Sequence, residues 1–465
     1  MYGKINSRIL DLLNGITGKD YVFSDKETLD KFSRDETEDL SFPPEVVVKP
    51  SDANQISGIL KLANEHKIPV YTRGGGTGLS GGALPLHGGI VISMERFNKI
   101  LDIDRNNFQA TVEAGVITQL FQEELEKEGL FYPVDPASRG SCFIGGNIAE
   151  CSGGPRAAKY GVTRNYVLAL EFVTPTGEII FTGARTIKNV TGYSLTQLLT
   201  GSEGTLGIVT KIVFRILALP KFKKIMLVAY NSVNDCITSV AEIYKNGVNP
   251  AALEFLEKAA INAAETQLNK VFPNSGAEAQ LLIEIDGNDE EQLNKEIQTI
   301  ADTIEKFSPV DIILAEERGK MEELWALRRS VGEAVKSIST YKEEDTVVPR
   351  AKMPELLEGI RKITGKYGIR AICYGHAGDG NLHVNILKDS LSDEYWNVNI
   401  KSAVKEIFEL TVSLGGTISG EHGIGYSQKE YLPIALSKEE IELSKNIKKV
   451  FDPNNILNPG KIFTD

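Results

Sequence analysis

The chain has 465 residues, enough for two or three domains at ~100–200 residues each, and its 42% hydrophobic and 25% charged content excludes a disordered chain. Lys and Arg total 51 and Asp and Glu total 63, so the formal net charge is −12 and no basic stripe supports nucleic-acid binding. No apolar run approaches the ~20 residues of a membrane-spanning helix. The N-terminus lacks secretory and transit-peptide patterns, so we expect a cytoplasmic protein.

Two residue types refine this class. The four cysteines include no C-x-x-C pair, which argues against an iron–sulfur cluster, a cysteine zinc site or a disulfide framework. The 43 glycines exceed the usual ~7% of a globular protein. An excess of glycine without a repeat indicates loops in which the backbone approaches a ligand closely.

The predicted elements begin with short amphipathic helices in residues 1–40. Strands at 45–49 and 68–72 flank a helix for which Ser51 is a good N-cap, giving a β-α-β unit. Further strands follow, and 168–181 resembles a hairpin. Beyond residue 220 the glycine loops disappear, and strands alternate with polar helices in an α+β pattern. We therefore expect domains at 1–220 and 221–425 and a helical C-terminal segment at 426–465.

The first glycine loop follows the second predicted strand directly. Gly76, Gly78 and Gly81 match the G-x-G-x-x-G fingerprint of dinucleotide-binding domains. That fingerprint requires a helix immediately after it, whereas Pro85 and further glycines lead here into another strand. A nicotinamide-binding Rossmann domain is therefore rejected, and the pattern favours a nest of backbone N–H groups around a diphosphate. A second glycine-rich stretch spans residues 141–154.

Several long motifs identify a family. The segments are PVYTRGGGTGLSGGA, VDPASRGSCFIGGNIAECSGG, GVTRNYVLALE, KNVTGYSLTQLLTGSEGTLGIVT and FDPNNILNPGKIF. Together they resemble the FAD-linked D-2-hydroxyacid dehydrogenases of the vanillyl-alcohol-oxidase superfamily, a family that includes the glycolate oxidase D-subunit. The resemblance implies an α+β fold in which a two-subdomain FAD-binding domain is followed by an α+β cap domain for substrate.

The resemblance also implies positions for the cofactor. The first loop would hold the pyrophosphate, the turn at 136–138 would lie near the diphosphate and adenine, Ile208 near the adenine, and the remaining residues would line the flavin. The cofactor-binding residues implied in this way are Arg73, Gly74, Gly75, Gly76, Thr77, Gly78, Leu79, Ser80, Pro136, Ala137, Ser138, Gly145, Gly146, Asn147, Ser152, Gly153, Tyr160, Gly161, Val162, Ile208 and Asn458. Covalent relatives attach FAD through a histidine in the first loop. Here His87 lies beyond that loop, so we expect non-covalent FAD.

A histidine hairpin carries the second signal. Asp379-Gly380 is a strong two-residue turn signal, and with that turn His376 lies opposite His383. Tyr374 then lies opposite Asn385, and all four side chains share one face of the sheet. Two imidazoles on opposed strands lie close enough to bind one metal ion, and a longer turn would change the pairing but keep them close.

A second motif, Ser419-Gly-Glu421-His422-Gly, adds a carboxylate and another histidine. Two histidines and one carboxylate suit a divalent ion with open positions for substrate. By resemblance His376, His383 and Glu421 are the metal ligands, and His422 is the base. Zinc is expected, with manganese or iron as alternatives.

The substrate is expected to be anionic. By resemblance Arg328 binds its carboxylate, and Arg328, His422 and Asn385 form the predicted catalytic set. Relatives that act on 2-hydroxyglutarate have a threonine and a lysine where this chain has Gly332 and Glu343. Because Glu343 would repel a second carboxylate, D-lactate or glycolate is expected rather than D-2-hydroxyglutarate.

The predicted function is therefore oxidation of a D-2-hydroxy acid to the 2-oxo acid by an FAD-dependent dehydrogenase or oxidase, with metal-assisted deprotonation. A D-2-hydroxyglutarate dehydrogenase, a non-catalytic flavin-binding subunit of a larger oxidase complex and a metal-dependent hydrolase are the alternatives. The expected electron acceptor is a quinone, a cytochrome, oxygen, an electron-transfer flavoprotein or an iron–sulfur subunit. A homo-oligomer or a hetero-complex, peripheral to the membrane through a partner, completes the expectation.

Overall fold

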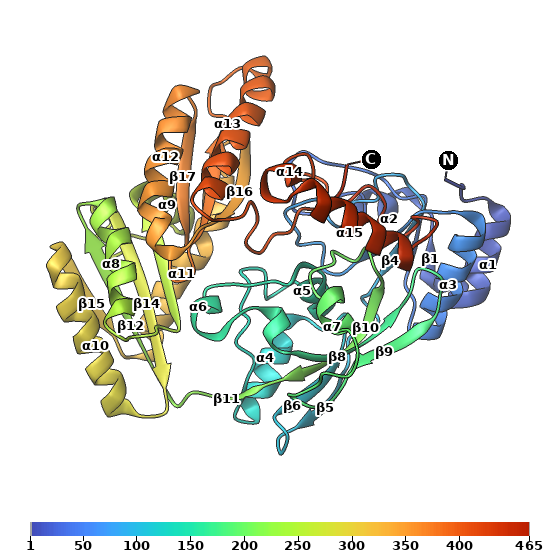
Figure 1. Cartoon of the computed structure of the whole chain (residues 1–465), viewed down its shortest axis with the longest axis horizontal. Coiled ribbons are helices and arrows are strands. Elements are labelled where there is room, and N and C mark those ends of the chain that lie inside the picture. The colour runs from blue at the N-terminus through green and yellow to red at the C-terminus, as the bar shows by residue number, and fades with distance from the viewer. Residues whose placement is uncertain (1, 465) are drawn as a thin grey trace. The chain divides into compact units, whose positions relative to one another are not determined.

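A computed structural model describes residues 2–464 and divides the chain into two compact units. The first unit comprises the chain up to Ser152, Val162–Leu219 and the chain from Glu421 onward. The second unit comprises Gly153–Gly161 and Pro220–Gly420. The boundary at Leu219 falls beside the expected one, whereas the return to the first unit precedes residue 425 and the short segment 153–161 joins the second unit. Figure 1 shows the elements of both units.

The first unit contains two sheets and a short two-stranded ribbon. The four-stranded sheet has the order β1-β2-β4-β3, in which β2, β4 and β3 are parallel and β1 is antiparallel. The five-stranded sheet, in the order β5-β6-β10-β8-β9, is antiparallel throughout. The strands are β1 (Val22–Phe23), β2 (Val46–Val48), β3 (Val70–Arg73), β4 (Ile90–Ser93), β5 (Ile100–Asp104), β6 (Gln109–Glu113), β7 (Leu130–Phe131), β8 (Val167–Val173), β9 (Ile179–Gly183), β10 (Ile208–Arg215) and β11 (Leu217–Ala218).

The helices of the first unit are α1 (Ser7–Thr17), α2 (Lys26–Lys31), α3 (Ala53–His66), α4 (Thr118–Lys127), α5 (Ile144–Glu150), α7 (Leu195–Leu199), α14 (Leu432–Ala435) and α15 (Lys438–Phe451). Helix α3 buries Ile56, Ile59 and Leu60, as its periodicity predicts. The predicted cap was wrong by one residue. Asp52, rather than Ser51, accepts hydrogen bonds from the first free N–H groups of α3, because a carboxylate can bond two of them.

The connection between β3 and β4 contains no helix among the described residues, which confirms the predicted order of strand, glycine loop and strand. β8 and β9 form the predicted hairpin, with Val173 paired to Ile179. The parallel strands β2 and β4 are buried along their whole length, at every residue of Val46–Val48 and of Ile90–Ser93. Strands buried on both faces read as continuous apolar runs, as these do.

The second unit is built on one antiparallel sheet of seven strands, in the order β15-β12-β14-β13-β17-β18-β16. The strands are β12 (Phe222–Tyr230), β13 (Ala252–Glu257), β14 (Ala279–Gly287), β15 (Asp311–Ala315), β16 (Tyr341–Val347), β17 (Arg370–His376) and β18 (Asn381–Leu387). The helices are α6 (Ala157–Tyr160), α8 (Val233–Lys245), α9 (Lys258–Leu268), α10 (Glu290–Ile304), α11 (Arg318–Lys336), α12 (Met353–Lys366) and α13 (Asp393–Ser413).

Helices α9 and α11 cover one face of this sheet. Leu327 and Val331 of α11 pack in one buried cluster with Ile372 of β17 and Leu387 of β18. Side chains alternate along a strand, so every second residue of β13, β17 and β18 faces these helices. Among the described helices none is both long enough and apolar enough to cross a bilayer.

Candidate active site

The two predicted glycine loops lie against one another in the first unit. A Cβ at Gly75 would collide with the carbonyl oxygen of Ser141, and one at Gly74 would lie 3.4 Å from the Phe143 side chain. The turn at 136–138 immediately precedes Ser141, and the N–H of Ser141 donates to the Ser138 carbonyl at 2.8 Å. The backbones of the two loops therefore lie in direct contact, so close that only glycine fits at position 75.

Helix α5 carries the second loop forward and contains adjacent glycines in opposite environments. A Cβ at Gly145 would lie 2.9 Å from the Cβ of Ala114, so this glycine is needed for packing. A Cβ at Gly146 would meet no protein atom within 4 Å. Asn147 is buried and its Nδ2 donates to the Ser152 hydroxyl at 3.3 Å. Gly146 thus leaves space beside the loops for a ligand.

The C-terminal segment returns to the same strand, β3. The N–H of Asn458 donates to the carbonyl of Val70 at 2.7 Å, and its Nδ2 donates to the carbonyl of Glu203 at 2.9 Å. Its Oδ1 is buried without a hydrogen-bond partner in the described part of the chain. An unpaired buried acceptor is costly, so this atom is suited to a donor from a bound ligand. Ile208, buried at the start of β10, also belongs to this unit.

The predicted flavin-lining residues are divided between the two units. Ser152 and Val162 lie in the first unit, whereas Gly153, Tyr160 and Gly161 belong to the segment held by the sheet of the second. In that segment the Tyr160 hydroxyl donates to Asp286 at 2.9 Å. Its neighbours are fixed by ion pairs, Lys159 to Asp286 at 2.6 Å and Arg156 to Glu284 at 3.1 Å.

The segment that carries His422 is fixed within the first unit. The carboxylate of Glu203 accepts from the N–H of Ile424 at 2.8 Å and from that of Gly425 at 2.6 Å. Ser80, at the end of the first glycine loop, donates its hydroxyl to the carbonyl of His422 at 3.0 Å. The predicted base is therefore hydrogen-bonded through its own backbone to the predicted pyrophosphate loop.

A group of ionisable side chains lies close to the segment that carries His422. Glu203 is buried and Glu150 is half-buried with one oxygen shielded from solvent, and burial raises the pKa of each, the proximity of Glu203 adding to the rise at Glu150. Lys461 donates to the carbonyl of Gly81, and burial lowers its pKa to about 7 despite the attraction of Asp35 and Glu203. The segment after His422 thus lies beside acidic groups whose pKa the protein environment raises.

The histidine hairpin of the second unit is confirmed, but its predicted pairing was wrong. Tyr374 lies opposite His383 and His376 lies opposite Asn381, a register shifted by two residues from the predicted one. The reason is a longer turn: β17 ends at His376 and β18 begins at Asn381. The imidazoles are diagonal neighbours on the shared face, with ring centroids 5.3 Å apart and planes at 85°. Both are buried.

Glu254 connects the hairpin to α11. It lies directly opposite His376 in the register of β13 and β17, and its side chain is fully buried. His376 Nδ1 is 2.9 Å from both carboxylate oxygens, and Arg328 Nε donates to Oε2 at 2.6 Å. Burial alone would raise the pKa of Glu254, but His376 and Arg328 hold it below its ordinary value. The guanidinium of Arg328 also lies over the ring of Tyr374, 5.2 Å from its centroid.

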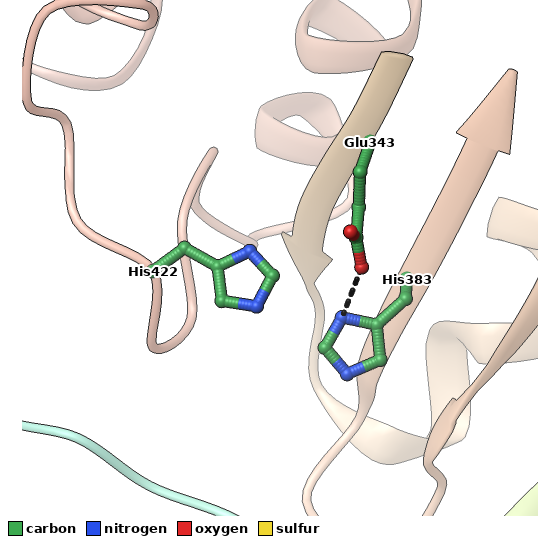
Figure 2. A group of neighbouring side chains, drawn as sticks. All are labelled: Glu343, His383 and His422. Carbon is green, nitrogen blue, oxygen red and sulfur yellow. Dashed lines mark ion pairs between the residues drawn. The ribbon is translucent and has the colours of Figure 1, made fainter. Parts of the chain in front are cut away.

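Glu343 and His383 point toward one another from neighbouring strands, β16 and β18 (Figure 2). His383 Nδ1 lies 3.8 Å from Glu343 Oε1, and Lys336 of α11 lies 3.5 Å from the other oxygen. Glu343 is thus a buried carboxylate beside a predicted metal ligand, and it is partly neutralised by a lysine. His422, the third residue drawn, belongs to the first unit.

Asp345 anchors the chain just before Glu421. Its carboxylate accepts from the N–H of Gly420 at 2.8 Å, from the Ser419 hydroxyl at 3.1 Å and from Asn381 Nδ2 at 2.7 Å. Glu421 is the next residue, so its Cα lies one peptide, 3.8 Å, from that of Gly420. Asn385, the remaining predicted catalytic residue, is fully buried on β18, and its Oδ1 has no hydrogen-bond partner among the described residues.

Sequence reasoning missed Glu254, Asp345 and Glu203. Glu254 had one available signal, because a glutamate at the centre of the apolar run Ala251–Leu256 is a charge in a buried strand. Glu203 lies in one of the family motifs, but its hydrogen bonds reach residues 221 and 222 positions later, which no local pattern reports. Asp345 lies beside Glu343 in a strand whose burial is not evident from its polar sequence.

Comparison with known proteins agrees with both units. Residues 44–183 match the FAD-binding domain family, and residues 219–462 match the C-terminal domain of FAD-linked oxidases. Among solved structures, p-cresol methylhydroxylase is similar over 98% of this chain and 96% of its own, with a TM-score of 0.82 at 18% identity, which supports the fold.

Three relatives are similar over most of their length. A D-lactate dehydrogenase of Anaerostipes hadrus is 36% identical, covering 99% of this chain and 98% of its own. The glycolate oxidase subunit GlcD of Bacillus subtilis is 41% identical, over 93% and 92%, and a D-2-hydroxyglutarate dehydrogenase of Stutzerimonas stutzeri is 34% identical, over 98% and 98%. With two family models and full-length relatives in agreement, this chain belongs to the FAD-linked oxidases of the vanillyl-alcohol-oxidase type.

Proposed function

We propose that the chain oxidises a D-2-hydroxy acid, D-lactate or glycolate, to the corresponding 2-oxo acid. One observation carries the proposal most directly. Arg328, although buried, uses only Nε for a hydrogen bond, and its two terminal nitrogens have no hydrogen-bond partner among the described residues. A planar pair of donors beside two buried imidazoles is suited to the carboxylate of a small acid.

The residues of the first unit fit FAD. Gly146 leaves open space beside two backbone loops, and the buried Asn458 Oδ1 offers an acceptor. When bound, FAD supplies the two-electron acceptor for the oxidation. The attachment is proposed to be non-covalent: His87 packs with Tyr2 at a ring distance of 5.2 Å, and a Cβ at Gly460 would lie 3.3 Å from its Nε2. Acid precipitation should therefore leave FAD in the supernatant.

The two histidines of the hairpin in the second unit fit a divalent metal. His376 and His383 would hold it, with Glu421 as the third ligand, and zinc is proposed with manganese or iron as alternatives. When bound, such an ion lowers the pKa of a substrate hydroxyl. The carboxylate bonded to His376 Nδ1 fixes the lone pair of that ring on Nε2, the arrangement that metal-binding histidines adopt.

The protein's own residues then divide the work of the reaction. Arg328 orients the substrate carboxylate through its terminal nitrogens. Asn385 Nδ2, buried on the same sheet face, can donate a hydrogen bond to the oxygen of the substrate hydroxyl. Neutral His422 accepts the hydroxyl proton as general base. Arg328 and Asn385 would hold two substituents of C2, the carboxylate and the hydroxyl, so one enantiomer alone presents its hydrogen to the acceptor.

The choice of a monocarboxylate depends on Glu343. A second substrate carboxylate near His383 would meet this buried acid, and Lys336 is already paired with it. Like charges brought together in a buried site disfavour each other by several kcal/mol. The relatives carry names for all three substrates, so the identity values alone do not select among them.

A panel of D- and L-2-hydroxy acids, added anaerobically to the purified protein, tests the proposal through bleaching of flavin absorbance. D-lactate or glycolate should reduce the flavin, and the L-lactate rate should be at least about tenfold lower. Glu343→Gln removes the acid and leaves Lys336 available, so the ratio of kcat/KM for D-2-hydroxyglutarate over D-lactate should rise. Wild-type preference for the dicarboxylate would overturn the substrate assignment, and no reduction by any acid would overturn the function.

The electron acceptor is proposed to be a partner. The relative named a glycolate oxidase subunit belongs by its name to an assembly. Cysteine spacing argues against an iron–sulfur cluster in this chain, so electrons are proposed to leave to an electron-transfer flavoprotein, an iron–sulfur subunit or a quinone. In a hetero-complex of that kind the chain would be peripheral to the membrane through its partner.

A further inference from the structure

Glu254 occupies a position where a charge is expensive. It lies in the central part of the seven-stranded sheet, its side chain is fully buried, and its same-face neighbours Ala252 and Leu256 belong to apolar clusters. Burying an ionised carboxylate costs several kcal/mol unless it is paired and hydrogen-bonded (about 3–5 for an unpaired one). The two partners that compensate this carboxylate are Arg328 and His376.

The contact with His376 is dictated by strand register. Glu254 and His376 are directly opposed across β13 and β17, and opposed residues have Cβ atoms only about 4.5–5.5 Å apart. A carboxylate can accept hydrogen bonds but not donate them, so His376 Nδ1 must carry the hydrogen. The tautomer that results keeps Nε2 available as a ligand atom.

The contact with Arg328 controls a second group. Arg328 Nε donates to Glu254 Oε2, and the guanidinium of Arg328 lies over the ring of Tyr374. Fixing Nε fixes the direction of the terminal nitrogens, because the guanidinium is planar. The Glu254 carboxylate therefore sets the orientation of both Arg328, the residue proposed to bind the substrate carboxylate, and His376, a proposed metal ligand.

We propose that Glu254 is the shared positioning residue of the active site, acting on metal affinity through His376 and on substrate affinity through Arg328. This inference rests on the proposed function, since it assigns Glu254 to the same two sites. It goes further by making the geometry of the two sites depend on one side chain that touches neither substrate nor metal.

Two substitutions separate the two contacts. Glu254→Gln can keep its amide oxygen at Oε2 for Arg328, but its NH₂ then faces His376 Nδ1 and forces the hydrogen to Nε2. Zinc affinity should fall about 10–100-fold, whereas KM for D-lactate at saturating zinc should change less than about threefold. Glu254→Ala loses both contacts, so zinc affinity should fall and KM should rise about tenfold or more.

The matched control is Glu284→Gln, on the neighbouring strand β14. Glu284 is equally buried and accepts from Arg156 and Trp325 instead of the site residues. This variant should lose stability but keep its zinc dissociation constant within about twofold of wild type. The measurement is zinc affinity of the metal-free, FAD-loaded protein by competition with a chromophoric chelator.

Double variants show through which residue Glu254 acts. In a His376→Ala background Glu254→Gln should not weaken zinc binding further, and in an Arg328→Lys background Glu254→Ala should add little to KM. Unchanged zinc affinity in Glu254→Gln would overturn the proposal. It would also be overturned if Glu254→Ala raised KM as much in the Arg328→Lys background as in the wild-type background. If Glu254→Ala does not fold, Glu254→Asp, too short to span both partners, replaces it with the same expectation. Wild-type protein that turns over D-lactate without binding zinc would instead count against the metal centre of the proposed function.

Discussion

At the scale of single residues, the second unit pairs its buried acids with specific cations. Glu284 is fully buried, with Arg156 at 3.1 Å, Lys223 at 3.6 Å and the Trp325 indole N–H at 2.7 Å. Burial would raise the pKa of Glu284, but these groups lower it to about 2. The native state therefore keeps this carboxylate ionised well below the pH at which the unfolded chain protonates it.

Glu284→Gln should consequently show a pH-dependent loss of stability. The lowered pKa contributes stability above the unfolded value of 4.5, and that contribution is lost as pH falls toward 2. A difference of about 2.5 pKa units corresponds to about 3 kcal/mol at pH 7. Urea unfolding at pH 7 and pH 3.5 should show the gap between variant and wild type shrinking by about 1.4 kcal/mol. A gap that is equal at both pH values would refute this account.

At the scale of elements, a substitution in helix α5 tests the cofactor site, because it should raise the stability of the FAD-free protein and lower its affinity for FAD. Alanine is favoured over glycine inside a helix by about 1 kcal/mol, and a Cβ at Gly146 meets no protein atom, so Gly146→Ala should stabilise the FAD-free protein. The same methyl group should weaken FAD binding if the flavin occupies the space beside it. Thermal unfolding without FAD and fluorescence titration with FAD measure the two effects. Gly145→Ala, which would meet the Cβ of Ala114 at 2.9 Å, is the control and should destabilise the FAD-free protein. Gly146→Ala with unchanged FAD affinity would remove this residue from the site.

The hairpin and the glycine loops show what sequence can and cannot predict about elements. Period-two alternation put His376 and His383 on one face, and that face is correct because it depends on parity alone. The pairing was wrong because it depended on turn length, and Asp379-Gly380 is only part of a longer turn. The loop after β3 was correctly separated from a Rossmann loop because Pro85 and the glycines exclude a helix there. Asp52 replaced Ser51 as cap of α3 for a local reason that sequence expresses weakly.

At the scale of the whole molecule, the chain passes between its units four times, whereas the sequence predicts boundaries only near residues 220 and 425. The excursion at 153–161 is held by Arg156, Lys159 and Tyr160, whose partners lie more than 120 residues away. Long-range ion pairs of this kind leave no periodic trace in the sequence. Family motifs, by contrast, identified the fold and chemistry because they preserve local loop conformations that physical patterns describe only in part.

The division into units predicts that the metal site can be removed while the cofactor site is kept. His383 lies in the second unit, whereas both glycine loops, Ile208 and Asn458 lie in the first. His383→Ala removes an imidazole from the proposed metal site without touching those loops, so the protein should lose bound zinc and at least about 10³-fold in turnover but retain FAD in near-stoichiometric amount. Metal analysis and the flavin absorbance of the purified variant measure both quantities. Asn397→Ala, an exposed position on α13, is the matched control and should keep metal, FAD and turnover. Loss of FAD together with zinc in His383→Ala would mean that the two cofactor sites are not separable in the way the units imply, whereas retained zinc would remove His383 from the metal site.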